Sequence, residues 1–267
     1  QMRPREALVM RFRAMASGLL PYGRAKVNDN SRPARTAYGS QEDGRKRPVV
    51  TIVQNFPDPT EIGAIQLYLK EKEIDSFLIN QDQLTFDAIK NSDLVIWNDL
   101  GFGMEGITDK DVLTYLQAHE ARIPLYFIGD DLASSMDHLR TSKTVWSDLL
   151  HLRYGTNGAF MLPVRITTPS HAVVQGPYGS VGDFTYASDS DEAQATSTGE
   201  VVLGTYEKGT VLVAHEHPQT GVRTVTQNFM VFNDSDPHGI VERRKLFLNA
   251  VAWLLASPIK TRMDRSQ

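Results

Sequence analysis

Short apolar runs alternate with amphipathic stretches along residues 49–129. Four of these runs are rich in Val, Ile and Leu and predict buried strands: VVTIVQN (49–55), SFLIN (76–80), DLVIWN (93–98) and PLYFIG (124–129). Continuous apolar strands of this kind are typical of parallel sheets whose two faces are both covered by helices. The pattern therefore predicts right-handed strand–helix–strand units and an open, mostly parallel sheet.

Two of the connecting stretches carry helix start signals. In FPDPTEIGAIQLYLKEKE (56–73), Asp58 is placed to cap the helix, Pro59 to occupy its first position and Glu61 to reach back to the cap. In the second stretch, Thr108 and Asp111 form a capping-box pair. Helical spacing turns the following residues toward the core: Ile62, Ile65 and Leu69 in the first helix, and Val112, Leu113 and Leu116 in the second.

The C-terminal half of the chain has a sequence pattern that predicts mainly β-structure. Residues 160–232 are rich in β-forming segments, and turn signals at EKG (207–209) and PQTG (218–221) predict hairpins. The segment DPHGIVERRKLFLNAVAWLLAS (236–257) then predicts a closing helix. The expected fold is α/β: a flavodoxin-like open sheet with helices on both faces, and a β-hairpin excursion in the C-terminal half.

Charge divides the chain into unequal parts. Residues 1–48 hold 11 Lys and Arg against 4 Asp and Glu, a net charge of +7, whereas the remainder carries −11. We expect residues 1–47 to form a basic, non-globular arm, residues 48–258 an α/β domain and residues 259–267 a tail. An Arg-rich, acid-poor start is compatible with a docking tail, a linker or a targeting segment.

As a docking tail, the arm would bind other protein subunits or a phosphate-bearing membrane surface. Its candidate partner-binding residues are Arg11, Phe12, Arg13, Leu19, Leu20 and Tyr22. Nucleic acid is not an expected partner, because the body is acidic and lacks an aromatic-basic face. The sequence shows no apolar stretch long enough to predict a membrane span.

The chain contains no cysteine, which excludes disulfides, thiolate zinc sites and cysteine nucleophiles. This absence matters because of a resemblance. The segments IGDDLA (128–133), PSHAVVQGPYG (169–179), VLGTYEKGTVLVAHEH (202–217), NFMVFND (228–234) and ERRKLFLNAVAWLL (242–255) resemble, in this order, the class I glutamine amidotransferase-like superfamily. The similarity covers residues 48–257 and is closest to the non-amidotransferase members, the trehalose-utilisation-type domains. It implies a flavodoxin-like sheet with an elbow at its carboxyl edge, and it favours a secreted or periplasmic location.

The catalytic residues of that superfamily do not carry over. Its amidotransferases have a G-x-C-x-G elbow, and matching GDDLA to it puts Asp131 at the nucleophile position and Ala133 at the second glycine. Their His-x-Glu pair follows the last strand, which in this chain corresponds to Asn233 and Ser235. An aspartate cannot replace a thiolate in glutamine hydrolysis. The resemblance thus predicts no catalytic residues and no cofactor.

Carboxylates gather at the expected carboxyl edge of the sheet, where open α/β sheets bind ligands. The residues concerned are Asp58, Asp99, Asp130, Asp131, Asp234 and Asp236, with His238 close by. They could form a hard-cation site, but each also suits a helix cap or a turn. For Asp131 we expect the second role, its carboxylate accepting bonds from amides at the start of the next helix.

Two further motifs are weaker. His215 and His217 would point to the same side of a strand, as some metal sites require, but the sequence shows no third ligand and a solvated strand end is the simpler interpretation. Gly101, Gly103 and Gly106 match G-x-G-x-x-G but lack the acidic residue expected on the next strand.

Three functions remain open from the sequence. The leading one is a non-catalytic structural or binding subunit tethered by its basic arm. The alternatives are a small-molecule or carbohydrate-processing enzyme of the trehalose-utilisation type and a cation- or ligand-binding accessory domain.

Overall fold

The structure is a computed structural model that describes residues 47–99, 106–156, 162–186, 191–205, 209–232 and 237–257. In these residues the main element is a mixed sheet of eleven strands. Five neighbouring strands are parallel, in the order β2-β1-β3-β4-β13. Their bounds are β1 Val49–Gln54, β2 Asp75–Asn80, β3 Leu94–Asp99, β4 Leu125–Gly129 and β13 Arg223–Gln227. The predicted parallel sheet is therefore confirmed, and it carries the fold of the flavodoxin-like α/β class.

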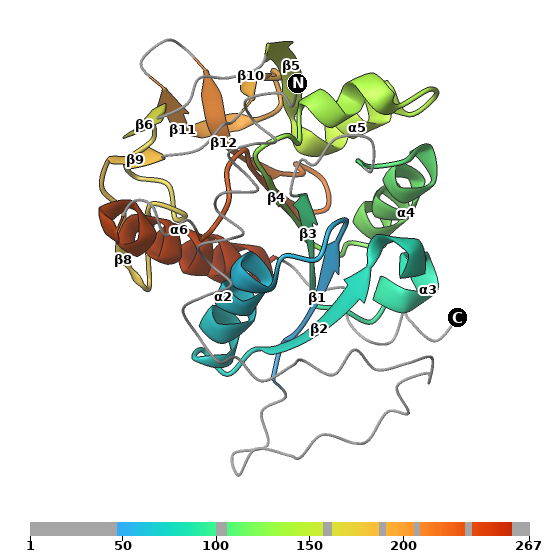
Figure 1. The fold of residues 1–267 in the computed structure, drawn as a ribbon, viewed down its shortest axis with the longest axis horizontal. Helices are drawn as coiled ribbons and strands as arrows, with labels where there is room; N and C mark the ends of the chain where they lie inside the picture. The colour runs from blue at the N-terminus through green and yellow to red at the C-terminus, as the bar shows by residue number, and fades with distance from the viewer. Residues whose placement is uncertain are drawn as a thin grey trace, which may run out of the picture. The chain divides into compact units, whose positions relative to one another are not determined.

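Helices cover both faces of the parallel strands (Figure 1). One face is packed by α2 (Pro59–Lys70) and α6 (Pro237–Leu255), the other by α3 (Phe86–Ile89), α4 (Asp109–Glu120) and α5 (Lys143–Leu150). Two short 3-10 turns complete this half of the domain: η1 (Gln81–Gln83) and η3 (Ser134–His138). No helix among these described segments is long and apolar enough to cross a membrane.

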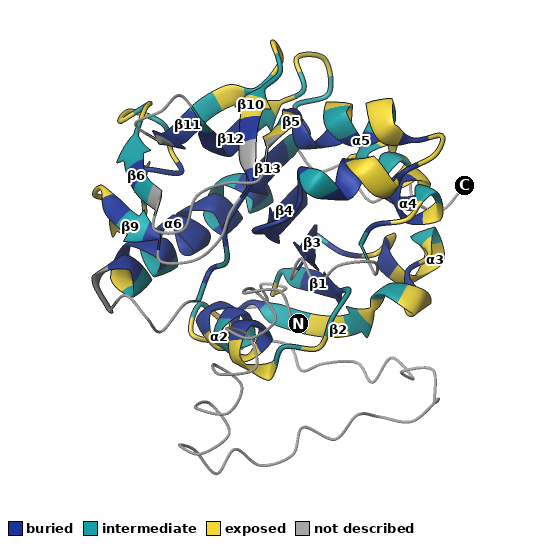
Figure 2. Cartoon of the chain, turned by 45° about the horizontal axis from the view of Figure 1, so that its top comes forward, coloured by how far each residue is buried: buried dark blue, intermediate teal, exposed yellow. Residues whose placement is uncertain are grey.

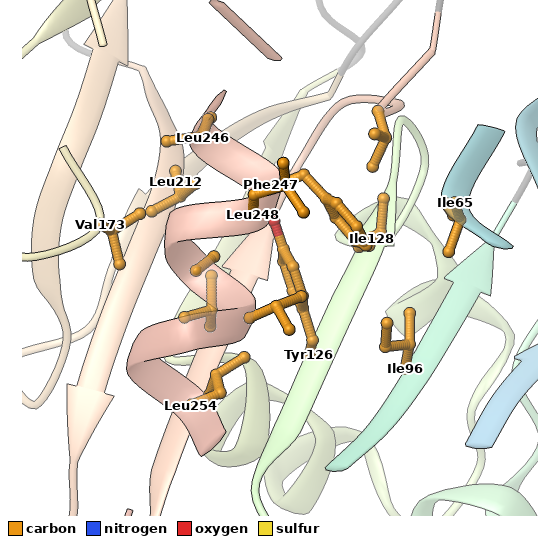
Figure 3. Close-up of a cluster of buried hydrophobic side chains, with 14 of the residues drawn as sticks. Ile65, Ile96, Tyr126, Ile128, Val173, Leu212, Leu246, Phe247, Leu248 and Leu254 are labelled. Carbon is orange, nitrogen blue, oxygen red and sulfur yellow. The ribbon is translucent and has the colours of Figure 1, made fainter. Parts of the chain in front are cut away.

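Alternation along each strand sends neighbouring residues to opposite faces. In β4, Tyr126 and Ile128 face the α2 and α6 side, whereas Leu125 and Phe127 face the α4 and α5 side. Tyr126 stacks on Phe247 of α6 with 5.8 Å between the ring centroids (Figure 3). The central strands are buried on both faces, while β2 is partly exposed at the edge (Figure 2).

The second half of the sheet is antiparallel. The order continues from β13 through β12 (Thr210–Glu216), β11 (Glu200–Thr205) and β6 (Leu162–Ile166) to β9 (Phe184–Tyr186). β10 (Glu192–Ala195) pairs with β12 and with β5 (Leu152–Thr156), and β7 (Gln175–Gly176) forms a small separate ribbon with β8 (Gly179–Ser180). The predicted hairpins β11–β12 and β12–β13 are both present.

Two details of the sequence prediction are wrong. The last strand was expected at NFMVFND (228–234), but it ends at Gln227, and residues 228–232 do not extend it. Leu113 is 51% exposed because Val112, Tyr115 and Ala118 occupy the inward face of α4. The predicted caps Asp58 and Thr108 are confirmed: Asp58 accepts bonds from the N–H groups of α2, and Thr108 shares a capping box with Asp111.

Candidate functional site

The elbow after β4 lies at the carboxyl edge of the parallel strands, next to the end of β3. Gly129 pairs with Asp99 there, and a Cβ added to Gly129 would lie 2.2 Å from the carbonyl oxygen of Asp99. Only glycine permits this close approach of the two strands. Asn55, just after β1, donates from Nδ2 to Oδ1 of Asp99 at 2.5 Å. Three strand ends thus meet at the elbow.

Asp130 and Asp131 are both buried at the elbow, with 7% and 9% of their surface exposed. Backbone bonds hold their position: the carbonyl of Asp130 accepts from the N–H of Asp191 at 2.9 Å, and that of Asp131 accepts from the N–H of Ser135 at 3.1 Å. The hydroxyl of Ser134 also donates to the carbonyl of Asp131 at 3.0 Å. The residue at the expected nucleophile position is therefore a buried acid in a well-bonded turn.

Asp191 supplies the carboxylate that binds the helical turn after the elbow. Its Oδ2 accepts from the N–H of Ser134 at 2.7 Å, and the N-cap residue of η3, Ala133, makes no side-chain capping bond. Asn228, directly after β13, donates from Nδ2 to the carbonyl of Asp191 at 2.5 Å. Asp191 was not among the residues singled out from the sequence. It lies 57 residues from Ser134 along the chain, and no local pattern could have identified it.

The last parallel strand ends earlier than the sequence predicted, so the residues that follow it are not the ones matched to the catalytic base. β13 ends at Gln227, opposite Ile128 of β4, so the first residues after it are Asn228 and Phe229. Asn228 is buried beside the elbow loop. The positions assigned from the sequence, Asn233 and Ser235, lie outside the described residues, as do Asp234 and Asp236. The side chain of His238 is not described either.

Glu61 of α2 holds the segment after β13. From its position three residues after Asp58, the side chain of Glu61 was predicted to bond to the N-cap of α2. This prediction is wrong. Its two carboxylate oxygens instead accept from the N–H groups of Val231 and Phe232 at 2.8 and 2.6 Å. These bonds, with Phe229 and Val231 packed into the core, turn the chain away from the sheet and explain why the strand ends early.

The environment of Glu61 is apolar and closed. Burial raises its pKa from 4.5 to about 8, although the N–H groups of Val231 and Phe232 and the nearby Arg243 act in the opposite direction. Arg243 of α6 is buried as well and donates from Nε to the carbonyl of Val231 at 3.2 Å. Tyr186 accepts at its hydroxyl from the N–H of Met230 at 3.1 Å. Residues 230–232 are therefore fixed by side chains from α2, α6 and β9.

The described members of the possible cation site do not form a cluster of ligands. Asp58 is used in capping α2, where its Oδ1 accepts from the N–H groups of Thr60 and Glu61. Among the residues that the structure describes, no group of three or more His, Asp or Glu side chains is arranged to hold a metal ion. The observed carboxylates at the edge are those of Asp99, Asp130, Asp131 and Asp191.

His215 and His217 lie at the opposite, amino edge of the parallel strands, at the end of β12. Two histidines that no sequence motif indicated join them: His151 after α5 and His119 in the last turn of α4. The ring centroids are 3.9 Å apart for His151 and His215, 6.4 Å for His215 and His217, and 5.8 Å for His217 and His119. We call these four residues the histidine row.

The remaining predicted sites are only partly described. Of the three motif glycines, Gly106 alone lies in the described part, and its carbonyl accepts from Nε2 of Gln81 at 3.1 Å. The candidate partner-binding residues of the arm lie outside the described residues: Arg11, Phe12, Arg13, Leu19, Leu20 and Tyr22. Their role remains a prediction.

Comparison with solved structures defines the class of the fold. The mmIFT52 N-terminal domain superposes with a TM-score of 0.57 at 10% identity, covering 79% of this chain and 99% of that one. A glutamine amidotransferase from Thermotoga maritima gives 0.55 at 10% identity over 79% and 100% of the two chains. A ThuA-like protein from Bacteroides uniformis gives 0.53 at 11% identity over 79% and 93%.

These likenesses show the fold: this chain shares it with a glutamine amidotransferase and a ThuA-like protein, as the sequence resemblance led us to expect. No protein-family model matches the chain. No curated protein matches it by sequence either.

Proposed function

We propose that this chain is a non-catalytic amidotransferase-like domain that acts as a structural or binding subunit of a larger assembly, tethered by its basic N-terminal arm. The observation that carries the proposal is the buried acid at the elbow. By the sequence resemblance, the buried Asp131 matches the position of the amidotransferase cysteine, and the chain contains no cysteine. A carboxylate has neither the thiolate's nucleophilicity nor its activation by a base.

The residues after β13 support the same reading. An amidotransferase needs a histidine beside its nucleophile, supplied just after the last strand. The residues that directly follow this strand are Asn228, Phe229 and Met230, none of which can act as a general base near neutral pH. The side chain of Asn228 bonds to the backbone of Asp191 and so stabilises the elbow.

Assembly is suggested by charge and by one of the structural neighbours. The chain joins an arm of net charge +7 to a body of −11, which favours binding of the arm to an acidic surface. The mmIFT52 structure is, by its name, an N-terminal domain, so the same fold occurs as one part of a longer protein.

The test compares the native mass of the full chain, purified from its own cells, with that of a variant lacking residues 1–47. Mass photometry should show a complex for the full chain and its loss in the truncated one, with circular dichroism reporting whether the body stays folded. The double variant Arg11→Ser with Arg13→Ser should weaken the complex, whereas the exposed pair Arg140→Ser with Arg153→Ser should not. An unchanged complex without the arm would overturn the tether.

One observation keeps an enzymatic alternative open. Four buried aspartates lie at the carboxyl edge, where α/β enzymes bind substrates, and a ThuA-like protein shares the fold. If the elbow is an active site of the trehalose-utilisation type, Asp131→Ala should abolish turnover of a carbohydrate substrate while leaving stability unchanged. If the elbow is structural, the same variant should instead lower the free energy of unfolding, because it removes a buried side chain from the turn.

A further inference from the structure

The histidine row connects three parts of the chain that are distant in sequence. His119 lies in the last turn of α4, and His151 follows α5 in the left-handed conformation with φ of 55°. His215 lies near the end of β12, and His217 directly follows that strand. Two turns are attached to this row: residues 196–199, between β10 and β11, and residues 217–222, between β12 and β13. Four of the seven histidines of the chain lie in this one place.

The histidine rings hold the first turn. His215 Nδ1 lies 2.7 Å from the carbonyl oxygen of Thr198, which can only accept, so this nitrogen carries the proton. His151 Nδ1 lies 2.9 Å from the hydroxyl of Thr198, and the carbonyl of His151 accepts from the N–H of Thr196 at 2.8 Å. A Cβ on Gly199 would lie 3.0 Å from that of His151, so the turn is closely packed against the row.

The second turn is held by His217, whose ring is the opposite tautomer to that of His215. His217 Nδ1 accepts from the N–H groups of Gln219 and Thr220, each at 3.3 Å, so its proton is on Nε2. A further proton on this ring must go to Nδ1. It would then face two N–H groups, and both bonds would be lost.

We propose that the histidine row is a pH-operated latch: its neutral rings hold the two turns at the amino edge of the sheet, and protonation below neutral pH releases them. The row does not suit a metal. The lone pair of His217 Nδ1 is already used by backbone donors, and its Nε2 carries a proton. The rings of His151 and His215 lie against each other with their planes tilted by 33°, and the described residues form no group of three or more ligands that could hold a metal.

Charges around the row do little to favour protonation. The carboxylates nearest to the row along the chain or across paired strands are those of Glu120, Asp148, Glu200 and Glu216. The nearest cations are Arg122, Arg153 and Arg223. Asp109, Lys110 and Asp111 lie at the other end of α4, and Lys143 lies at the other end of α5. Glu216, beside His215, is paired with Arg223 at 2.7 Å, which reduces its attraction for an imidazolium. The nearest titratable neighbours of each ring are the other histidines, which repel a second proton.

Burial adds to this repulsion. Desolvation first, and then the other histidines, lower the pKa of His119 to about 4 and that of His151 to about 3. The pKa of His215 is also lowered, mainly by desolvation. Since unfolded histidine takes up its proton near pH 6.5, the unfolded state binds more protons between these values. The stabilisation by the neutral row is therefore complete above pH 6.5 and is lost as the pH falls toward 4.

The test measures unfolding of the full chain by chemical denaturation at pH 7 and pH 5. The double variant His119→Gln with His151→Asn removes two titrating rings, and Asn tolerates the left-handed backbone at position 151. The unfolding equilibrium constant should rise at least about tenfold more in the parent than in this variant between the two pH values. His138→Gln, an exposed histidine on η3, is the matched control and should behave like the parent. Equal pH dependence in the double variant and the parent would overturn the proposal.

A second measurement does not depend on the variant being folded. Imidazole resonances of the parent chain, followed by NMR, should show His119 and His151 still neutral at pH 5. Amide exchange at Gln219 and Thr220, corrected for the intrinsic effect of pH, should accelerate relative to the central strand β3. Ordinary titration of both rings near pH 6.5, or unchanged protection of these two amides, would contradict the latch.

Discussion

Glu61 and Val231 are joined by a buried hydrogen bond across 170 residues of sequence: the N–H of Val231 donates to the carboxyl group of Glu61 at 2.8 Å. The bond links the first turn of α2 to the segment after β13. It fixes the loop that leaves the carboxyl edge beside the elbow, where an amidotransferase would carry its base.

Replacing Glu61 with Gln should destabilise the fold. Glutamine keeps the size of the side chain but offers one acceptor oxygen for two N–H donors, the buried one of Val231 and the partly buried one of Phe232. One donor loses its partner, at a cost of about 1 to 3 kcal/mol in the free energy of unfolding, measured by denaturant titration. Glu120→Gln, at the exposed end of α4, serves as the control and should be neutral. Equal stability of both variants would mean that the bonds from Val231 and Phe232 to Glu61 contribute nothing to the stability of the fold.

The same residue should give the protein an alkaline pH dependence. Burial raises the pKa of Glu61 to about 8, so the folded state holds a proton that the unfolded state has released above about pH 4.5. The free energy of unfolding due to this group therefore falls as the pH rises from 5 to 8. Subtracting the profile of Glu61→Gln from that of the parent should isolate this decline. A difference profile that is flat or rises with pH would refute it.

Two glycines form a matched pair for testing the elbow. Gly129→Ala should destabilise the fold by at least about 2 kcal/mol, because its methyl group would overlap the carbonyl of Asp99. Gly63→Ala, on the exposed face of α2 with no atom within 4 Å of the new Cβ, should stabilise by up to about 1 kcal/mol. The melting temperatures of the two variants should shift in opposite directions. A Gly129→Ala variant as stable as the parent would contradict the close approach of Gly129 to the carbonyl of Asp99.

Asp191 should matter to stability as a cap. Asp191→Ala leaves the N–H of Ser134 without its carboxylate and should cost about 0.5 to 2 kcal/mol. Asp148→Ala, exposed on α5, should change the unfolding free energy by less than about 0.5 kcal/mol. If the two variants were equally stable, the turn after the elbow would not depend on Asp191.

Calcium should leave the melting temperature unchanged. The carboxylate of Asp58 already binds the amides of α2, and the described acidic residues form no cluster of ligands. Binding of a cation to the folded state alone would raise the melting temperature by mass action, and a chelator would reverse the rise. A shift of several degrees with millimolar calcium would restore the cation-site interpretation.

The local signals in the sequence predicted much of the fold. The strands β1, β3 and β4 could be predicted from their apolar runs alone, because a strand that is buried on both faces is apolar along most of its length. Asp58 and Thr108 were recognisable as caps, since their partners lie within three residues. The absence of cysteine, combined with Asp131 in the elbow, was also enough to predict from the sequence that the chain does not carry amidotransferase chemistry.

What only the tertiary structure decided depends on contacts between distant segments. Glu61 has the spacing of a capping-box residue, yet the segment after β13 offers two amides in an apolar site, and the carboxyl group turns to them. The end of β13, the role of Asp191 and the meeting of four histidines follow from the same cause. The sequence by itself determined which stretches form strands and helices, because that depends on neighbours three or four positions away. The packing of those elements decided which polar side chains meet in the interior, where each buried donor or acceptor must find a partner.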